Sequence, residues 1–434
     1  MIRTFGDLSF VTAPKSHASA LDELEVTLNF FGDWAPSSGR SEFGLQHALN
    51  YLPETLSNYL SRSDINVLNL ETTITQDAIV SGGTSRLFRE PPSALEFLKR
   101  HNFNLASLAN NHVMDYLEAG LKETLDHLDT YSLGHAGAGF DRDKIYQPYR
   151  FEKNAEKISI LCVADGEMGN ERFNNGVGTA DVTSFRLVDQ IRKSKAEGYF
   201  TIVFVHAGVE FLPYPPPFIQ DIYRNLVDQG ADCVIGHHPH IVQGMEFYSG
   251  APIFYSVGHF DLYRKTARSS ERLGLMVSLG LSDAQLTRVN LLPFRIEEQA
   301  INLLDKAEFN NFLELFKERS AHLSDSDFLD KLWGSYVSTR QPLLDFRRAV
   351  SLYRTDSDLS IKTARTIVSS LNSGFMYKTF EEKPVCDNQC RKILREHRLL
   401  RKQGIWERIF LSQKDLFRYP VTVLRKLFKM VTRI

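Results

Sequence analysis

The chain has 434 residues, of which 43% are hydrophobic and 24% are charged, and its formal net charge is −2. This composition is ordinary for a folded soluble protein, and the length allows two or three domains or one large domain with appendages. No window approaches the roughly 18 consecutive apolar residues of a transmembrane helix. The first residues also lack a basic segment followed by a long apolar core, so no secretory signal is visible. We therefore expect a cytoplasmic protein.

Apolar runs alternate with helix-like segments along the first 300 residues. Helices are predicted over residues 92–101 and 218–230, and an antiparallel hairpin over residues 274–296. This alternation favours a layered α/β fold over an all-β fold. The predicted strands are the runs 25–33, 65–71, 104–112, 158–166, 200–208, 232–240 and 251–260.

The character of the sequence changes in its second half. We predict an N-terminal arm over residues 1–24, a main domain over 25–298, a helical appendage over 299–385 and a basic amphipathic tail over 386–434. From Arg391 onward there are 13 Lys and Arg residues against 3 Asp and Glu residues, interleaved with apolar side chains at helical spacing. Such a tail suits an anionic membrane surface. A packed terminal helix with a solvated basic face is the alternative.

Nearly every predicted strand ends in a side chain that can bind a metal or move a proton. In layered α/β folds the strand ends converge on one edge, where sites form. Carboxylate, amide oxygen and imidazole groups together suit a divalent metal that activates water for hydrolysis. The side chains at these strand ends are Asp33, Glu71, Asn111, His112, His206, His238 and His240.

Several of these residues also have a simpler interpretation. Asp33 suits a helix or turn cap, and Glu71 suits a surface ion pair. Asn111 tolerates turn geometry, and a single histidine such as His206 is more often a hydrogen-bonded core residue. Asp115 equally suits the start of a helix. The order of these residues at successive strand ends favours a common site.

The stretch 232–240 holds three histidines in four positions, His237, His238 and His240. In an extended strand that continues to residue 240, side chains alternate between faces with a period of two. His238 and His240 then face the site, and His237 faces away from it. We therefore expect His238→Ala to lose metal and His237→Ala to keep most of it.

From Val26 to Phe260 the chain resembles the CapA, or poly-γ-glutamate capsule synthesis, family, which is similar to the calcineurin-like metallophosphoesterases. The resemblance is carried by the segments FFGD, NLETTIT, LANNHVMDYLEAGL, VHAGVEFLPYPPP, GADCVIGHHPHIVQGMEFYSG and IFYSVGHF, in this order. It implies an α/β fold, a calcineurin-like β-sandwich flanked by helices, with a C-terminal helical extension.

The resemblance also implies a centre of two divalent ions, of Mn, Fe or Zn, with Glu71 as the carboxylate that bridges them. His112 would protonate the leaving group, and Asp115 would orient the His112 imidazole from behind. The implied metal ligands are Asp33, Glu71, Asn111, His206, His238 and His240.

Two positions depart from the pattern of these relatives. Many metallophosphoesterases have an Asp-x-His motif whose imidazole binds the first metal, whereas Ala35 follows Asp33 by two residues here. The CapA-like proteins share this departure. Where that family usually has Gly-Asn-Phe, this chain has Gly258, His259 and Phe260. His259 is an additional ligand, a substrate contact or a neutral change.

These features predict a metal-dependent, phosphoesterase-like hydrolase that cleaves a phosphoester or an amide bond in the biosynthesis of capsule, poly-γ-glutamate or another cell-surface polymer. The expected partner is an anionic or phosphorylated polymer or its precursor. Peripheral contact with the inner face of the membrane is expected through the tail, and nucleic acid is not expected. The alternative is a polymer-binding or assembly protein at the membrane with little or no catalysis, which Ala35 favours slightly.

Overall fold

The computed structural model describes residues 9–10, 25–38, 40–76, 87–165, 176–265 and 269–337. The chain divides into two compact units, Met1–Ser326 and Asp327–Ile434. The named strands and helices all lie in the first unit. The predicted boundary at residue 298 lies within this unit, and the predicted tail over residues 386–434 lies outside the described residues.

The first sheet contains nine strands within the described residues. In order across the sheet they are β1 (Ser9–Phe10), β18 (Gln285–Ile296), β17 (Leu273–Ser282), β2 (Val26–Trp34), β3 (Ile65–Leu70), β6 (Leu105–Ser107) and β7 (Gly134–Ala136), with β16 (His259–Asp261) beside β2 and β19 (Ile301–Leu303) beside β18. β2, β3, β6 and β7 are parallel, and β17 and β18 form an antiparallel hairpin next to β2.

The second sheet contains six strands of the described chain. Their order is β14 (Met245–Tyr248), β15 (Ala251–Phe254), β13 (Cys233–His237), β12 (Phe200–His206), β10 (Glu156–Ala164) and β9 (Tyr149–Lys153). β10, β12, β13 and β15 are parallel. Two short strand pairs lie outside both sheets: β4 (Thr73–Ile74) with β5 (Arg89–Glu90), and β8 (Ala138–Gly139) with β11 (Gly178–Thr179).

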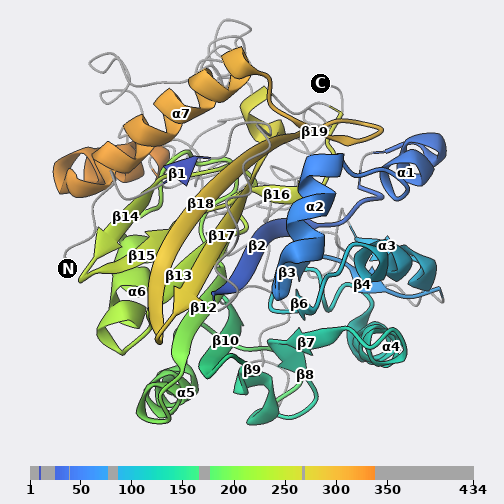
Figure 1. The fold of residues 1–434 in the computed structure, drawn as a ribbon, viewed down its shortest axis with the longest axis horizontal. Helices are drawn as coiled ribbons and strands as arrows, with labels where there is room; N and C mark the ends of the chain where they lie inside the picture. The colour runs from blue at the N-terminus through green and yellow to red at the C-terminus, as the bar shows by residue number, and fades with distance from the viewer. Residues whose placement is uncertain are drawn as a thin grey trace, which may run out of the picture. The chain divides into compact units, whose positions relative to one another are not determined.

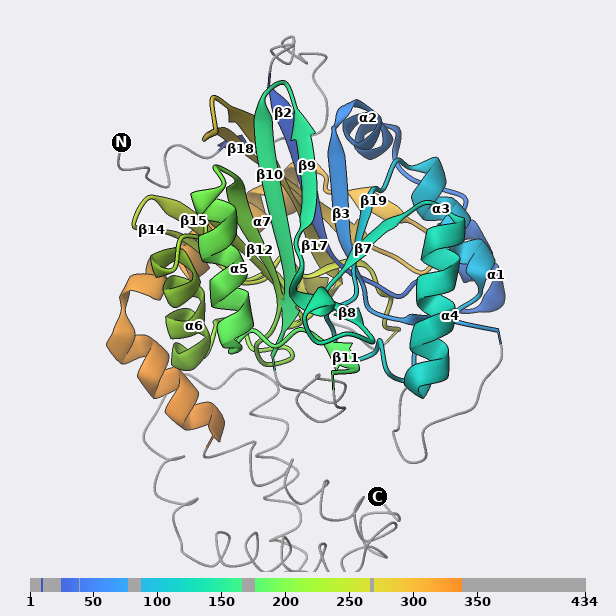
Figure 2. The same ribbon diagram turned by 90° about the horizontal axis from the view of Figure 1, so that it is seen from below.

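The two sheets face each other, and helices cover their outer faces (Figure 1). α2 (Glu54–Arg62), α3 (Leu95–Arg100) and α4 (Leu117–Thr130) pack on the first sheet, and α5 (Phe185–Ala196) and α6 (Pro217–Asp228) on the second (Figure 2). None of the helices in the described ranges is both long and apolar enough to cross a bilayer. The other helical elements are α1 (Glu42–Ala48), α7 (Lys306–Ala321), η2 (Pro92–Ala94), η3 (Lys144–Tyr146), η4 (Ser269–Arg272) and η5 (His322–Ser324).

The central strands are apolar on both faces because both faces are covered. In β12, Ile202 and Phe204 point into the core between the sheets, whereas Val203 and Val205 pack beneath the helices of the second sheet. The same alternation holds along β13. At the end of such a strand, the next residue in the inward-facing series therefore points its side chain toward the opposite sheet.

The layered α/β fold and the hairpin predicted from the sequence are confirmed. The strand predicted over 232–240 is too long, because β13 ends at His237. His238 and His240 have φ angles of 96° and 59°, so the chain leaves the extended conformation there. The strand predicted over 104–112 also ends early, at Ser107.

A bulge in β2 turns Asp33 toward the second sheet. Up to Phe30, alternate residues of β2 face the core between the sheets, and Phe31 faces the helices of the first sheet. The pairing of β2 with β3 changes register between Phe30 and Asp33. Because a bulge inserts one residue, the alternation is reversed and Asp33 points inward. Gly32 lies in this bulge, and a Cβ added there would come within 1.7 Å of the carbonyl oxygen of Gly258.

Gly32→Ala is therefore expected to destabilise the fold. The added methyl group must displace β2 or β16, and overpacking of this kind costs about 1–3 kcal/mol in the free energy of unfolding. Urea denaturation measures this loss. Gly334→Ala is the matched control, since a Cβ at residue 334 meets no heavy atom of the described residues within 4 Å and alanine favours a helix. An equal free energy of unfolding for Gly32→Ala and wild type would contradict the close contact between Gly32 and Gly258.

Candidate metal centre

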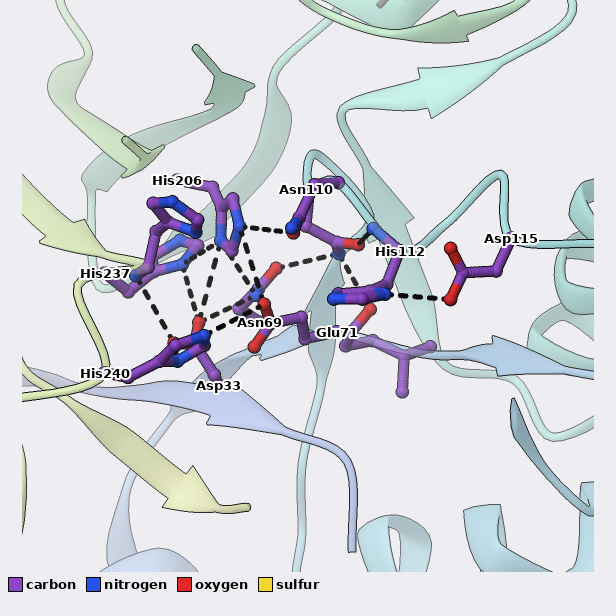
Figure 3. A network of polar contacts seen from close by, with 12 residues as sticks. Asp33, Asn69, Glu71, Asn110, His112, Asp115, His206, His237 and His240 are labelled. Atoms are coloured by element: carbon purple, nitrogen blue, oxygen red, sulfur yellow. Dashed lines mark hydrogen bonds and ion pairs between the residues drawn. The ribbon is translucent and has the colours of Figure 1, made fainter. Parts of the chain in front are cut away.

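The carboxyl ends of strands from both sheets meet at one edge of the sandwich (Figure 3). Asp33 lies near the end of β2, and Glu71 directly follows β3. From the second sheet, His206 ends β12 and His237 ends β13. Contacts between these groups join the converging strand ends into a single cluster. The loops after β6 and β13 add Asn111, His112, His238 and His240.

Asp33 is at the centre of the cluster and is fully buried. Its Oδ1 accepts a hydrogen bond from Nδ2 of Asn69 at 2.9 Å and lies 3.0 Å from Nδ1 of His237. Its Oδ2 accepts a hydrogen bond from the backbone N–H of His238 at 3.3 Å and lies 3.2 Å from Nδ1 of His240. Groups from both sheets therefore surround this one carboxylate.

These contacts keep Asp33 ionised. Burial alone would raise the pKa of the carboxyl group, because it disfavours the charged form. The contacts with His206, His237 and His240 outweigh burial and hold the pKa of Asp33 well below its usual range. The site thus contains a buried negative charge, as a cation site requires.

Glu71 and Asn111 lie on the other side of His206. Oε1 of Glu71 is 3.7 Å from Nε2 of His206 and 3.8 Å from Nε2 of His240. Nε2 of His206 is also 2.9 Å from Oδ1 of Asn111. Glu71 is fully buried, so it does not lie at the surface as an exposed ion pair would. Through His206 and His240, the two carboxylates are linked in one cluster.

The arrangement of these groups suits a divalent metal. Three groups of side chains within the described residues each bring one ligand atom per residue to within 4.8 Å of one another. Such oxygen and imidazole donors are suitable ligands for Mn, Fe or Zn. Because Asp33 and His240 each belong to two groups, the three groups adjoin. They are Asp33 with His206 and His237, Asp33 with His240 and His259, and Glu71 with His238 and His240.

Three imidazoles of this cluster, those of His206, His237 and His259, are in the state that binds metals. Burial lowers the pKa of His206 and His259 to well below their usual values, and it also lowers the pKa of His237. These rings are therefore neutral, with a lone pair available. Nε2 of His237 and both ring nitrogens of His259 are buried without a hydrogen-bond partner in the described structure. Buried polar atoms of this kind are costly unless something else satisfies them.

The prediction that His237 faces away from the site is wrong. Its Nδ1 lies 2.9 Å from Nδ1 of His206 as well as 3.0 Å from Asp33, and the residue is fully buried. Along β13 the inward-facing residues are Cys233 and Ile235, and His237 is the next in that series. His238 also approaches the site, but for a different reason. The chain turns after β13, and φ is positive at His238.

We therefore expect His237→Ala to weaken metal binding rather than to leave it unchanged. The substitution removes a group that touches both Asp33 and His206 and so positions two implied ligands. Loss of such a supporting group typically costs about 10- to 100-fold in metal affinity. Titration of the metal-free protein with Mn²⁺ measures the change. An unchanged dissociation constant would show that the contacts of His237 do not support the site.

His112 and Asp115 form a pair beside the cluster. Nδ1 of His112 lies 2.8 Å from Oδ2 of Asp115, which also accepts a hydrogen bond from the backbone N–H of Phe88 at 2.7 Å. The Phe88 ring lies 4.2 Å from the imidazole, and Oδ1 of Asn110 accepts a hydrogen bond from the backbone N–H of His112 at 3.0 Å. The role predicted for Asp115, the orientation of His112, stays a prediction, and this contact is the one through which it would act.

Three residues of the cluster are not among the predicted ligands, namely Asn69, Asn110 and His237, and His259 is a fourth for which the sequence leaves a ligand role open. Nδ2 of Asn110 donates to Oδ1 of Asn69 at 3.1 Å, and Asn69 in turn donates to Asp33. The alternation along β3 contains a signal for Asn69, because it follows Ile65 and Val67 on the inward face. His259 depends on the pairing of β16 with β2, for which the sequence contains no local signal.

A layered α/β sandwich with a buried carboxylate and histidine cluster at its strand ends defines a candidate metalloprotein. Residues 27–262 match the sequence profile of the family described as bacterial capsule synthesis protein PGA_cap. Because the match covers more than half of the chain, the protein belongs to this family. The resemblance inferred from the sequence motifs is thereby confirmed.

Curated relatives carry related names. The chain is 30% identical over 209 residues to the PGA biosynthesis protein CapA of Bacillus subtilis (strain 168), a match that covers 47% of this chain and 54% of that protein. It is 24% identical over 294 residues to the capsule biosynthesis protein CapA of Bacillus anthracis, covering 66% and 70%. A probable polyglutamine synthesis accessory protein of Mycobacterium tuberculosis is 26% identical, covering 59% and 73%. The chain thus spans about half the length of the first relative.

Proposed function

We propose that this protein is a metal-dependent hydrolase of the phosphoesterase-like type that acts in the biosynthesis of capsule, poly-γ-glutamate or another cell-surface polymer. The observation that carries the proposal is the convergence of two buried carboxylates with several neutral imidazoles, next to a separate His–Asp pair. The carboxylates and imidazoles are suitable ligands for a metal ion, and the His–Asp pair is suited to proton transfer. A site with both elements is equipped for hydrolysis.

The residues present fit one or more divalent ions. Asp33 and Glu71 would supply the charge, and the amide oxygen of Asn111 and the neighbouring imidazoles would complete the ligand set. A bound divalent ion would supply Lewis-acid chemistry, which polarises a phosphoryl or carbonyl oxygen and lowers the pKa of water. The buried ring nitrogens of His237 and His259 support this assignment, because a cation satisfies lone pairs that the protein does not.

The protonation step would fall to His112. Its Nδ1 faces Asp115, so a proton on that nitrogen is held in place and Nε2 is the atom that can exchange a proton with a substrate. Phe88 lies against the ring and limits its rotation. We propose that Nε2 of His112 donates a proton to the departing oxygen or nitrogen, while Asp115 stabilises the imidazolium form before the proton is transferred.

A cation beside the cluster supports an anionic substrate. The guanidinium carbon of Arg264 lies 4.2 Å from the centre of the Phe211 ring, and that ring lies 5.6 Å from the ring of His240. The charge of Arg264 also contributes to the lowered pKa of His259. Arg binds phosphate and carboxylate groups readily. We propose an anionic or phosphorylated polymer, or its precursor, as the substrate, in keeping with the names of the relatives.

The test is hydrolysis by the purified full chain with Mn²⁺, Fe²⁺ or Zn²⁺. A phosphomonoester, a phosphodiester and a γ-glutamyl peptide serve as substrates, and turnover of at least one that disappears on chelation is expected. Absence of turnover with every metal, together with tight binding of poly-γ-glutamate, would contradict the proposal. That outcome would favour a polymer-binding or assembly protein instead.

A further inference from the structure

His259 is held directly beside Asp33 by the backbone. It begins β16, which pairs with β2 so that His259 is opposite Asp33. The N–H of Asp33 donates to the carbonyl oxygen of Gly258 at 3.3 Å. This approach requires glycine in β2 at Gly32, as described above, and again at Gly274, where a Cβ would come within 2.1 Å of the carbonyl oxygen of His259.

Neither ring nitrogen of His259 has a hydrogen-bond partner in the part of the chain that the structure describes. The residue is fully buried, and Nδ1 and Nε2 both lack a hydrogen bond within the described residues. The ring is stacked on that of His240, with 4.7 Å between centroids and 18° between planes. Burial of an imidazole without hydrogen bonds opposes folding. The sequence would therefore be expected to contain an apolar side chain here unless the ring had another function.

The residues around His259 indicate that this other function is metal binding. Asp33, His240 and His259 each offer a ligand atom, and these atoms lie within 4.8 Å of one another. Imidazole and carboxylate ligands lie about 2.1 Å from a bound ion such as Zn²⁺, so two ligands of one ion are at most about 4.2 Å apart. To meet at one ion, the three groups must move closer and one of the stacked His240 and His259 rings must turn, because the lone pairs of nearly parallel rings do not converge. Ala35, two residues after Asp33, cannot contribute a ligand.

We propose that His259 is a metal ligand that, with Asp33 and His240, completes one metal position of the centre. In this position an imidazole from β16 takes the place that an Asp-x-His motif would otherwise fill from β2. The inference rests on the proposed metal centre and adds a ligand that motif matching does not assign. The three ligands come from β2, β16 and the loop after β13, so this metal position joins both sheets.

The proposal predicts opposite effects of His259→Leu on the metal-free and the metal-loaded protein. In the metal-free state the variant should be more stable than wild type, because an apolar side chain replaces a buried ring without hydrogen bonds. In saturating Mn²⁺ it should be less stable, because one ligand is missing. Melting temperatures in EDTA and in Mn²⁺ measure both states. A purely structural role of His259 would lower stability in both.

Direct metal binding gives the second readout. His259→Leu and His259→Asn should each raise the dissociation constant for Mn²⁺ at least tenfold, and should change the visible absorption of the Co²⁺-loaded protein. His101→Leu is the matched control, because Nε2 of His101 is also buried without a hydrogen bond but belongs to none of the three ligand groups. It should bind Mn²⁺ like wild type.

The outcomes separate this inference from the proposed function. If wild type binds no divalent metal, the metal centre itself is contradicted, and the role of His259 with it. If wild type binds Mn²⁺ and both His259 variants have the same dissociation constant and Co²⁺ spectrum as wild type, the ligand role of His259 alone is overturned.

Discussion

Asp33→Asn is expected to abolish metal binding and hydrolysis together. The Asp33 carboxylate belongs to two of the three ligand groups, and its pKa is held well below the usual range, so it carries a full charge in the folded protein. Asparagine keeps the shape of the side chain but not this charge, and it replaces one acceptor oxygen with a donor NH2 group. The affinity for Mn²⁺ should fall by more than about 100-fold, which is the upper range for losing a group that only supports a ligand.

Calorimetric titration with Mn²⁺ and an assay at saturating substrate measure both effects. Asp64→Asn is the control, because Asp64 is at the opposite end of the same sheet, where its Oδ2 accepts a hydrogen bond from the backbone N–H of Thr27 at 2.8 Å. Its amide oxygen can keep that bond, and metal affinity should not change. Normal Mn²⁺ binding by Asp33→Asn would remove Asp33 from the ligand set.

His112→Gln should have the second-largest effect, and on turnover alone. A general acid contributes about 10²- to 10⁴-fold to the rate, so kcat should fall within that range. Metal affinity should stay near the wild-type value, since His112 belongs to none of the three ligand groups. The loss should be larger for an alkyl phosphate than for a nitrophenyl phosphate, because a good leaving group needs little protonation.

A second His–Asp pair provides the control for His112. Nε2 of His135 lies 3.1 Å from Oδ1 of Asp129 at the outer surface of the first sheet, away from the cluster. His135→Gln should leave kcat unchanged for both substrates. A loss in His112→Gln that is equal for good and poor leaving groups would show that His112 positions the substrate and does not protonate it.

The sequence predicts the site well where strands end regularly. Glu71 and His206 come at the ends of apolar strands in parallel sheets, and the rule that such ends converge is enough to bring them together. The layered fold follows from the same alternation of apolar runs and helices. For these parts, local patterns and one general rule of sheet geometry are sufficient.

The sequence fails where the backbone departs from regular geometry. Asp33 faces inward only because β2 has a bulge, and a simple alternation from Phe30 would place it on the outer face. His238 and His240 lie beyond the end of β13, so the alternation holds only when it is counted from the core residues of the strand itself. Counted that way, it points His237 into the site.

His259 shows a second limit of sequence reasoning. Its position depends on the pairing of a three-residue strand with β2, and that pairing in turn depends on glycines far apart in the chain. No periodic pattern around His259 indicates this contact. Only the folded chain places the ring next to Asp33, where its nitrogens have no hydrogen-bond partner among the described residues.

The metal content of the purified protein tests the central claim most directly. Wild type and His238→Ala are loaded with Mn²⁺, freed of excess ion by gel filtration and analysed by plasma mass spectrometry. Bound Mn²⁺ in wild type and its loss in His238→Ala are predicted, because His238 belongs to the group that contains Glu71 and His240. Wild type without bound metal, or equal metal content in the two proteins, would contradict a metal centre built from these residues.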